Sequence, residues 1–145
     1  YQGRSFGNEK QKYVTIILDD RHPKIFGLDR LDNSRTVYVV EGPIDSLFLE
    51  NGIAVAQSDL RLPQYKDKAV LVPDNEPRNV EVCKQIQKFI DDGYTVCIWP
   101  EDIKEKDIND MILSGMTSAE IQSIIHSNTH KGLQAQTVFN SWKRN

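Results

Sequence analysis

The chain has no large excess of charge of one sign, few cysteines and no long apolar run. Lysine and arginine number 18 against 21 aspartates and glutamates. The net charge of −3 therefore gives no general attraction to nucleic acid or to anionic membranes, and any such binding needs a local basic patch. Cys83 and Cys97 both stand among apolar neighbours. They do not form a disulfide framework and indicate reduced core residues of an intracellular protein.

Several further classes of protein and site are excluded by what is missing. No apolar run approaches the about 20 residues of a membrane span, so no membrane partner is expected. Two separated cysteines and three histidines do not make a zinc module, and we expect no zinc in this chain. His126 and His130 have a metal-binding spacing but no further ligand nearby, which favours a structural role. Because Tyr1 stands in place of Met, we expect the sequence to be a piece of a longer chain.

What the chain does contain is an alternation of strand-like and helix-like segments. Continuous β-branched or apolar runs predict strands, and apolar residues spaced at helical intervals predict helices. Predicted strands are 14–18, 24–28, 36–40, 53–56, 69–72 and 94–99, and predicted helices are 43–50, 78–92, 108–113, 116–125 and 135–145. The alternation from residue 36 onward predicts an α/β fold with a mostly parallel sheet flanked by helices. A small N-terminal β-containing segment and a C-terminal helical tail complete it.

Carboxylates follow the ends of the predicted strands. In parallel sheets, ligands bind beyond the carboxyl ends of the strands, so acids placed there are candidates for a single site. The candidate set is Glu41, Asp45, Asp74, Glu76, Asp107 and Asp110.

Each acid has a structural explanation when it is taken alone. Asp45 stands in a first helical turn, where the helix dipole favours a negative charge. Asp74 and Glu76 belong to the turn sequence DNEP, and Asp107 suits the N-cap of a following helix. Taken together, carboxylates at one sheet edge repel each other unless a cation is bound. Hard oxygen ligands indicate Mg²⁺ or Mn²⁺, which usually shares its coordination with a substrate phosphate.

The spacing of these acids resembles a known signature. A glutamate-glycine pair at a strand end, an aspartate four residues later, and a next strand ending in D-x-D or D-x-E characterise Toprim domains. Here EGPID and DNE carry that pattern. Toprim domains occur in DnaG-type primases, topoisomerases, and some nucleases and repair proteins. The segments YQGR, IFGLD and KDIND resemble elements of bacterial-type primases. The whole run, with VVEGPIDSLFL, VPDNEPRN and IWPEDIKEKDINDMI, most resembles the primases of T-even-type bacteriophages, and the resemblance covers essentially all 145 residues.

The resemblance implies a division of the chain and a set of partners. Residues 1–35 would be the N-terminal basic and β segment of an RNA polymerase core, 36–115 the Toprim catalytic core, and 116–145 a C-terminal helical segment. The activity would be RNA primer synthesis at the replication fork, by two-metal transfer of nucleotides from NTPs on a single-stranded DNA template. A replicative helicase would be a partner, and the location would be the cytoplasm, that of the host cell for a phage protein.

The same resemblance implies roles for individual residues. Glu41 would be a metal ligand or acid/base group, Asp74 the principal metal ligand, and Glu76 the third acid. Asp107 would face the metal, whereas Asp45 and Asp110 are weaker candidates. The nucleotide- or DNA-binding set would be Arg4, Lys12, Arg78 and Lys106. Glu76 departs from the commoner aspartate, and Asn109 stands where cellular enzymes have a second acid.

Two other functions stay open on the sequence. A Toprim nuclease would use the same acids to hydrolyse phosphodiesters. A non-catalytic module would use the sheet as a scaffold and the C-terminal segment, with Phe139 and Trp142, to dock a helicase. A topoisomerase needs a nucleophilic tyrosine, and nothing marks Tyr38, Tyr65 or Tyr94 as one.

Overall fold

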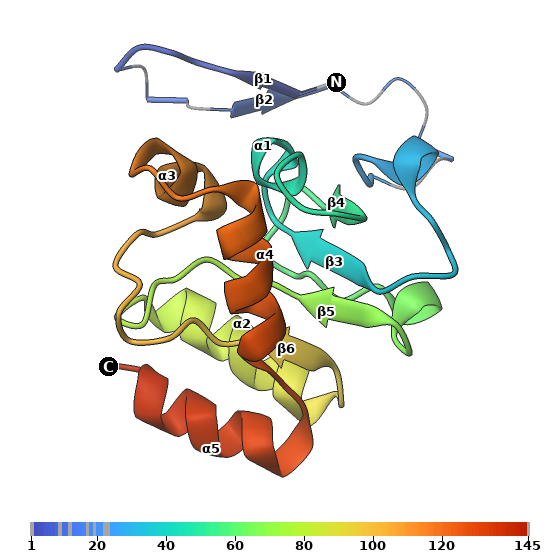
Figure 1. Ribbon diagram of the computed structural model, residues 1–145. Helices are drawn as coiled ribbons and strands as arrows, with labels where there is room; N and C mark the ends of the chain where they lie inside the picture. Colours follow the sequence, from blue (N-terminus) through green and yellow to red (C-terminus); the bar gives the residue numbers. More distant parts are fainter. Residues whose placement is uncertain are drawn as a thin grey trace.

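A five-stranded sheet forms the centre of the computed structural model, which describes residues 2–8, 10–11, 13–16, 18, 20–21 and 24–144 (Figure 1). Its strands are β3 (Val37–Val40), β4 (Gly52–Ala54), β5 (Ala69–Leu71), β6 (Thr95–Cys97) and β7 (Thr129–His130). Their order is β4-β3-β5-β6-β7, and only β7 runs antiparallel to its neighbour in this sheet. The predicted α/β architecture with a mostly parallel sheet is confirmed.

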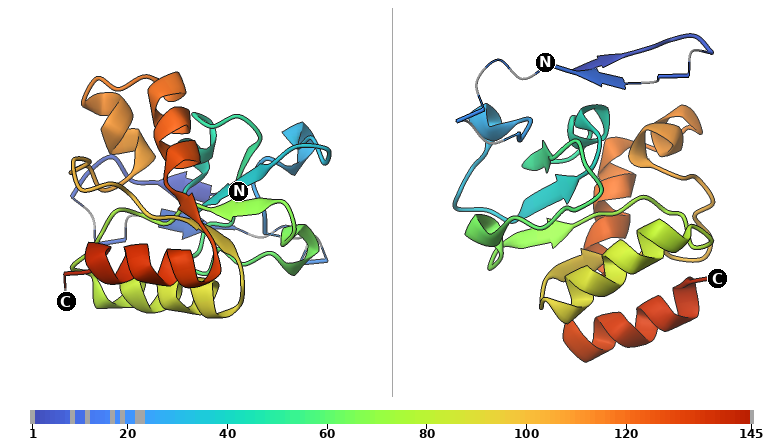
Figure 2. Two further views of the ribbon diagram at one scale, coloured as in Figure 1. Left: turned by 60° about the horizontal axis from the view of Figure 1, so that its bottom comes forward. Right: turned by 180° about the vertical axis from the view of Figure 1, so that it is seen from behind.

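Helices cover both faces of this sheet. They are η1 (Leu28–Arg30), α1 (Pro43–Ser46), η2 (Pro63–Tyr65), α2 (Val80–Asp91), α3 (Ile108–Leu113), α4 (Ser118–Ser127) and α5 (Gly132–Trp142). One core lies between the sheet and the pair α2 and α5, which run side by side in Figures 1 and 2. The second core lies on the other face, under α3 and α4. Apolar strands buried on both faces are typical of such a layered sheet.

Local sequence explains why the main helices form where they do. The apolar stripe of α2 is buried at Cys83, Ile86, Phe89 and Ile90, and the side chain of Asn79 accepts the N–H groups of the first turn. In α4, the predicted capping box between Thr117 and Glu120 is present in both directions. Cys83 and Cys97 are buried and are not joined in a disulfide, as predicted.

Several predicted bounds are wrong. The strand predicted at 24–28 is a single bridge from Phe26 to Ala54, followed by η1. The strand predicted at 14–18 is β2 (Tyr13–Thr15), which pairs with β1 (Gln2–Arg4) in a separate two-stranded sheet. This pair confirms the small N-terminal β-containing segment. The edge strand β7 was not predicted, and α5 starts three residues earlier than predicted.

The helix after β3 is also shorter than predicted. It was predicted to span 43–50, but it ends at Ser46. Asn51 adopts a left-handed conformation with φ of 55°, and its side chain donates to the carbonyl oxygens of Asp32 and Thr36. These contacts direct the chain into β4 after little more than one turn. As a result, Ile44 and Leu47 of the predicted apolar stripe are 45% and 55% exposed.

The connections between the strands diverge at one point of the sheet's carboxyl edge. The chain leaves β3 through α1 toward β4 on one side, and leaves β5 through α2 toward β6 on the other. Neighbouring strands whose connections diverge in this way form a topological switch point, where open α/β sheets bind ligands. Within the part of the chain that the structure describes, no helix combines the length and apolar character needed to cross a bilayer.

Candidate functional site

The candidate carboxylates gather around the switch point between β3 and β5. Glu41 directly follows β3, and Asp74 follows β5 after Val72 and Pro73. Electrostatic interactions link these two acids to each other and to the acids of α1 and α3. We call the set the acidic edge: Glu41, Asp45, Asp74, Glu76, Asp107 and Asp110.

Asp74 carries the largest perturbation of an acid in this set. Its side chain is 20% exposed. Burial raises its pKa to about 7, and the negative charges of Glu41, Asp45 and Asp107 add to the effect, while Lys106 opposes it. The raised pKa of Asp74 thus comes first from its burial and second from the neighbouring carboxylates. A pKa perturbed in this way is typical of functional sites.

Asp45 connects α1 to α3. Its Oδ1 accepts the backbone N–H of Asn109 at 2.8 Å, so it satisfies an N–H in the first turn of α3, in addition to standing in the first turn of α1. Its pKa is raised to about 6, first by burial and then by the charges of Asp107, Asp110 and Glu41, while the Asn109 hydrogen bond acts in the opposite direction. A Cβ atom on Gly42 would lie 3.0 Å from Asp45 Oδ2, so glycine leaves room for this carboxylate.

Asp107 and Asp110 occupy the start of α3. Asp107 is its N-cap and accepts the backbone N–H of Asp110 at 2.8 Å, so the structural role expected of it is present. Asp110 is exposed in the first turn. Both charges act on Asp45, which brings the α3 acids within electrostatic reach of the switch point.

Glu41 is exposed at the sheet edge and still has a perturbed carboxylate. Loss of solvent around it raises its pKa, and Glu76 adds to the rise while Lys106 opposes it. A carboxylate that water can reach and that neighbouring acids make more basic is suited to holding a cation or a proton.

Lys106 is the cation of the acidic edge. Its Nζ lies 3.6 Å from Glu76 Oε1 and 4.0 Å from Asp74 Oδ2, and its side chain is 54% exposed. Burial lowers its pKa, but Glu76, Asp74 and Asp107 outweigh this and leave the pKa raised. The residue predicted to face nucleotide therefore lies between two predicted metal ligands.

Asn75, which sequence reasoning missed, holds the loop that carries Asp74 and Glu76. Its backbone N–H donates to Lys106 O at 2.6 Å. Its side-chain nitrogen donates to Ile103 O at 2.9 Å and Glu105 O at 3.1 Å, and its oxygen accepts Trp142 Nε1 at 3.2 Å. The side chain is buried, so the acid loop is fixed to segment 103–106 and to α5. An asparagine between two acids in a turn gave no signal of these long-range partners.

A cavity of about 20 Å³ lies beside Glu41 and Asp74, room for about one water molecule. Gln85 also lines it, and the buried Oε1 of Gln85 has no hydrogen-bond partner among the residues that the structure describes. Within those same residues, no three His, Cys, Asp or Glu side chains converge closely enough to enclose a metal ion by themselves. Any cation here must draw some of its ligands from water or substrate.

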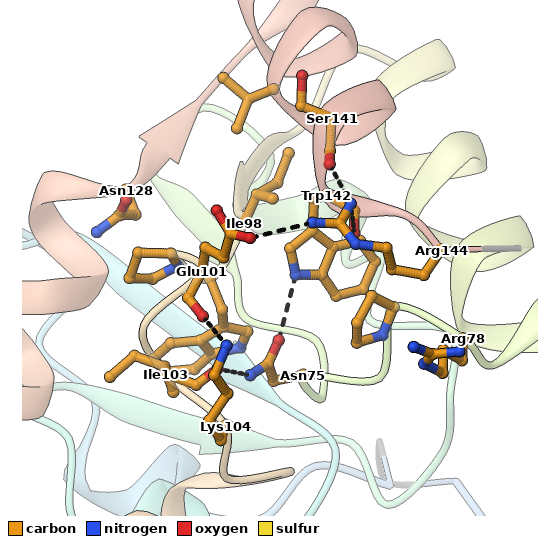
Figure 3. A pocket seen from close by; sticks show the side chains of 14 residues that line it. Asn75, Arg78, Ile98, Glu101, Ile103, Lys104, Asn128, Ser141, Trp142 and Arg144 are labelled. Carbon is orange, nitrogen blue, oxygen red and sulfur yellow. Dashed lines mark hydrogen bonds and ion pairs between the residues drawn. The ribbon is translucent and has the colours of Figure 1, made fainter.

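The other predicted basic residues are spread over the molecule. Arg78 is exposed in the loop before α2 and, like Asn75, lines a cleft that contains none of the acidic-edge residues among its described lining (Figure 3). Arg4 is exposed on β1, in the separate two-stranded sheet. Lys12 lies outside the described residues. The structure thus brings Lys106, but not the whole basic set, to the acids.

Comparison with known proteins gives one informative similarity. The chain is 43% identical over 141 residues to the DNA primase of Enterobacteria phage T4. The matched part covers 94% of this chain but 41% of that primase, so the chain spans about two fifths of its relative's length. No family model matches the chain. The similarity relates the chain to a part of a phage DNA primase.

Proposed function

We propose that the chain is the Toprim catalytic part of a DNA primase and transfers ribonucleotides from NTPs to a growing primer on single-stranded DNA. The observation that carries the proposal is that Glu41 and Asp74 stand at the ends of β3 and β5, on either side of the switch point and within electrostatic reach of each other, with the pKa of Asp74 raised to about 7. Similarity to the T4 primase supports the choice of reaction. Because the chain covers two fifths of that relative, other parts of a primase would complete the activity.

The residues present fit a magnesium or manganese ion. Mutual repulsion of the carboxylates, the small cavity beside Glu41 and Asp74, and the unpartnered Gln85 oxygen all favour a hard cation. Mg²⁺ usually takes one or two carboxylates and completes its shell with water and phosphate, which agrees with the lack of a closed protein cage in the described chain. When bound, two such ions would neutralise the phosphates and activate the attacking hydroxyl.

The chain's own residues then orient the reactants. Asp74 and Glu76 would hold the metal, and Glu41 would act as a further ligand or accept the proton of the primer 3′-hydroxyl. Asp45 fixes α3 against α1, Asp107 caps α3, and both keep negative charge near the site. Lys106, once its two carboxylates bind metal, would be free to contact a nucleotide phosphate.

Partners follow from the same proposal. Single-stranded template and NTPs would meet the site from solvent, where Arg4 and Lys12 are the candidates for template contact. A replicative helicase would be a partner of the whole primase. Binding of template and NTPs would not require a positive net charge of the chain, because local cations can contact the phosphates.

The nearest alternative is a Toprim nuclease, because the same acids can activate water toward a phosphodiester. Incubation of the chain with single-stranded DNA, labelled NTPs and Mg²⁺ distinguishes a primase from a nuclease and from a non-catalytic module. Labelled oligoribonucleotides support the primase proposal, and shortened template supports the nuclease. Neither product, together with no Mn²⁺ binding by the chain, favours a non-catalytic helicase-binding module and contradicts the proposal.

A further inference from the structure

We propose that the cleft behind the acid loop is a second binding site, which takes the phosphates of a nucleoside triphosphate without metal. The cleft has a volume of about 440 Å³, within the range of about 300–1,000 Å³ of small-molecule pockets. It lies between the 75–78 loop, the end of β6 with the loop that follows it, and the C-terminal end of α5 (Figure 3). We call it the basic cleft.

The charge of this cleft is opposite to that of the acidic edge. Arg78, Lys104 and Arg144 line it, and Glu101 is the acid among the described lining residues. Three positive charges against one negative charge leave a net charge of two positive units. Glu101 Oε1 lies 3.6 Å from a guanidinium nitrogen of Arg144, across the ion pair drawn in Figure 3. Glu101 therefore competes with any anion for Arg144.

The walls between these cations are apolar and rigidly held. Pro77, Pro100, Ile103 and Val138 contribute apolar surface. The C-terminal end of α5 is fixed there, because the backbone N–H of Arg144 donates to Pro77 O at 2.7 Å. An apolar wall with charged groups at its rim suits a ligand with a flat base and a polyanionic tail.

The number of cations in a small volume favours a triphosphate over other anions. A cleft of this size holds one nucleotide, and one nucleotide of a DNA strand brings a single phosphate charge. Three cations around one nucleotide match a triphosphate better than a phosphodiester. Arg and Lys contacts to phosphate oxygens are charge-assisted and therefore strong for their number.

The two tryptophans of the chain make this site directly observable. Trp99 and Trp142 are the only two in the sequence, and both line the cleft. Trp142 Nε1 donates to Asn75 and Trp99 Nε1 donates to Pro73 O at 2.8 Å. Fluorescence excited at the red edge of the indole band therefore reports on this cleft and on the 73–75 loop to which both indoles donate, and the charge variants below separate the two.

The test is a titration of the chain with ATP in EDTA, followed by tryptophan fluorescence. We expect a saturable change with ATP and with tripolyphosphate, and none with adenosine. The double charge reversal Arg78→Glu with Lys104→Glu should weaken ATP binding about tenfold or more, and Glu101→Gln should strengthen it about threefold. Lys131→Glu, at the opposite end of α5, is the matched control and should bind as the unchanged chain does.

The same titration distinguishes this proposal from the proposed function. Asp74→Asn should leave metal-free ATP binding unchanged, whether or not the chain is a primase. Four outcomes overturn the basic cleft as a nucleotide site. Two are that ATP causes no fluorescence change, or that Asp74→Asn is the one variant that abolishes the change. The other two are that the double reversal leaves ATP binding unaffected, or that only an oligodeoxynucleotide or an acidic peptide gives a saturable signal. Circular dichroism on each variant establishes that it is folded, and Arg78→Gln with Lys104→Gln replaces the double reversal if that variant unfolds.

Discussion

The acidic edge and the basic cleft both draw residues from one short loop, 74–78, and have opposite electrostatics. On one side, Lys106 acts on four of the six carboxylates, and the pKa of Asp74 rises to about 7. On the other side, three cations surround the cleft with one acid. Asn75 is buried in this loop and bonds to segment 103–106 and to Trp142. The contrast teaches that one fixed turn can separate an acid-rich region from a cation-rich region of the same surface.

Removing charge from the acidic edge should have the largest effect and should leave the cleft untouched. Glu41→Gln and Asp74→Asn each remove a ligand charge with little change of shape. In the whole primase, we expect either change to lower primer synthesis by about 100-fold or more, because charge stabilisation carries most of such a reaction. Labelled oligoribonucleotide formation measures it.

The matched control is Asp67→Asn, which lies before β5, at the other end of that strand from Asp74. It should retain activity. Full activity in both Glu41→Gln and Asp74→Asn would remove the basis for assigning metal ligands here.

Replacing Asn75, which holds the loop shared by the two regions, should disturb both regions at once. Asn75→Ala leaves the carbonyls of Ile103 and Glu105 and the N–H of Trp142 without their partner. We expect the free energy of unfolding to fall by about 2–4 kcal/mol, measured by urea denaturation. Both Mn²⁺ binding and metal-free ATP binding should weaken.

Alanine at the exposed Asn33 is the control for that loss and should change the free energy of unfolding little. If Asn75→Ala weakens only one of the two binding activities, the loop does not couple the regions in the way described.

The raised pKa values predict that the metal-free chain loses stability as the pH rises. The folded-state pKa of Asp74, about 7, lies above its ordinary value of 3.8, so the unfolded chain releases this proton more easily. The stability of the folded chain that depends on protonated Asp74 is fully present below about pH 4 and is lost as the pH rises through 7. At about 1.4 kcal/mol per pKa unit, we expect a loss of about 2–4 kcal/mol between pH 4 and pH 8 in EDTA.

Asp74→Asn should remove most of this dependence, and Mg²⁺ should restore stability to the unchanged chain at pH 8. Urea denaturation at several pH values measures both effects. An equal slope with pH in the unchanged chain and in Asp74→Asn would be inconsistent with this origin.

Replacing Lys106 should give the smallest effect. It also separates two roles of Lys106, which are competition with the metal for the carboxylates and contact with a nucleotide phosphate. Lys106→Gln removes the cation that competes for Asp74 and Glu76, so Mn²⁺ should bind about two- to tenfold more tightly. The KM for NTP should rise, because a phosphate contact is lost. Weaker Mn²⁺ binding in this variant would mean that Lys106 organises the ligands rather than competing with metal.

The sequence was sufficient for the features that depend on local periodicity. Buried apolar runs predicted β3, β5 and β6, the stripe of α2 predicted its buried face, and the capping box marked the start of α4. The acids that follow β3 and β5 were predicted to meet because strand ends in a parallel sheet share an edge. Their meeting is a consequence of topology, which the alternation of elements already indicated.

Features set by distant contacts were not predictable in the same way. The two-residue β7 is too short to have a pattern, and α1 ends early because Asn51 bonds to Asp32 and Thr36. The role of Asn75 depends on backbone carbonyls and on α5, far along the chain. Lys106 was predicted to face nucleotide, but its ion pairs with two acids become visible only in three dimensions.

The position of a bound Mn²⁺ ion tests the central claim most directly. Crystals of the chain soaked in Mn²⁺ give an anomalous signal that locates the ion without reference to activity. We predict a peak at the switch point, in contact with Glu41, Asp74 or Glu76, that disappears in crystals of Asp74→Asn. A manganese peak away from these three carboxylates would contradict the assignment of the acidic edge as the metal site.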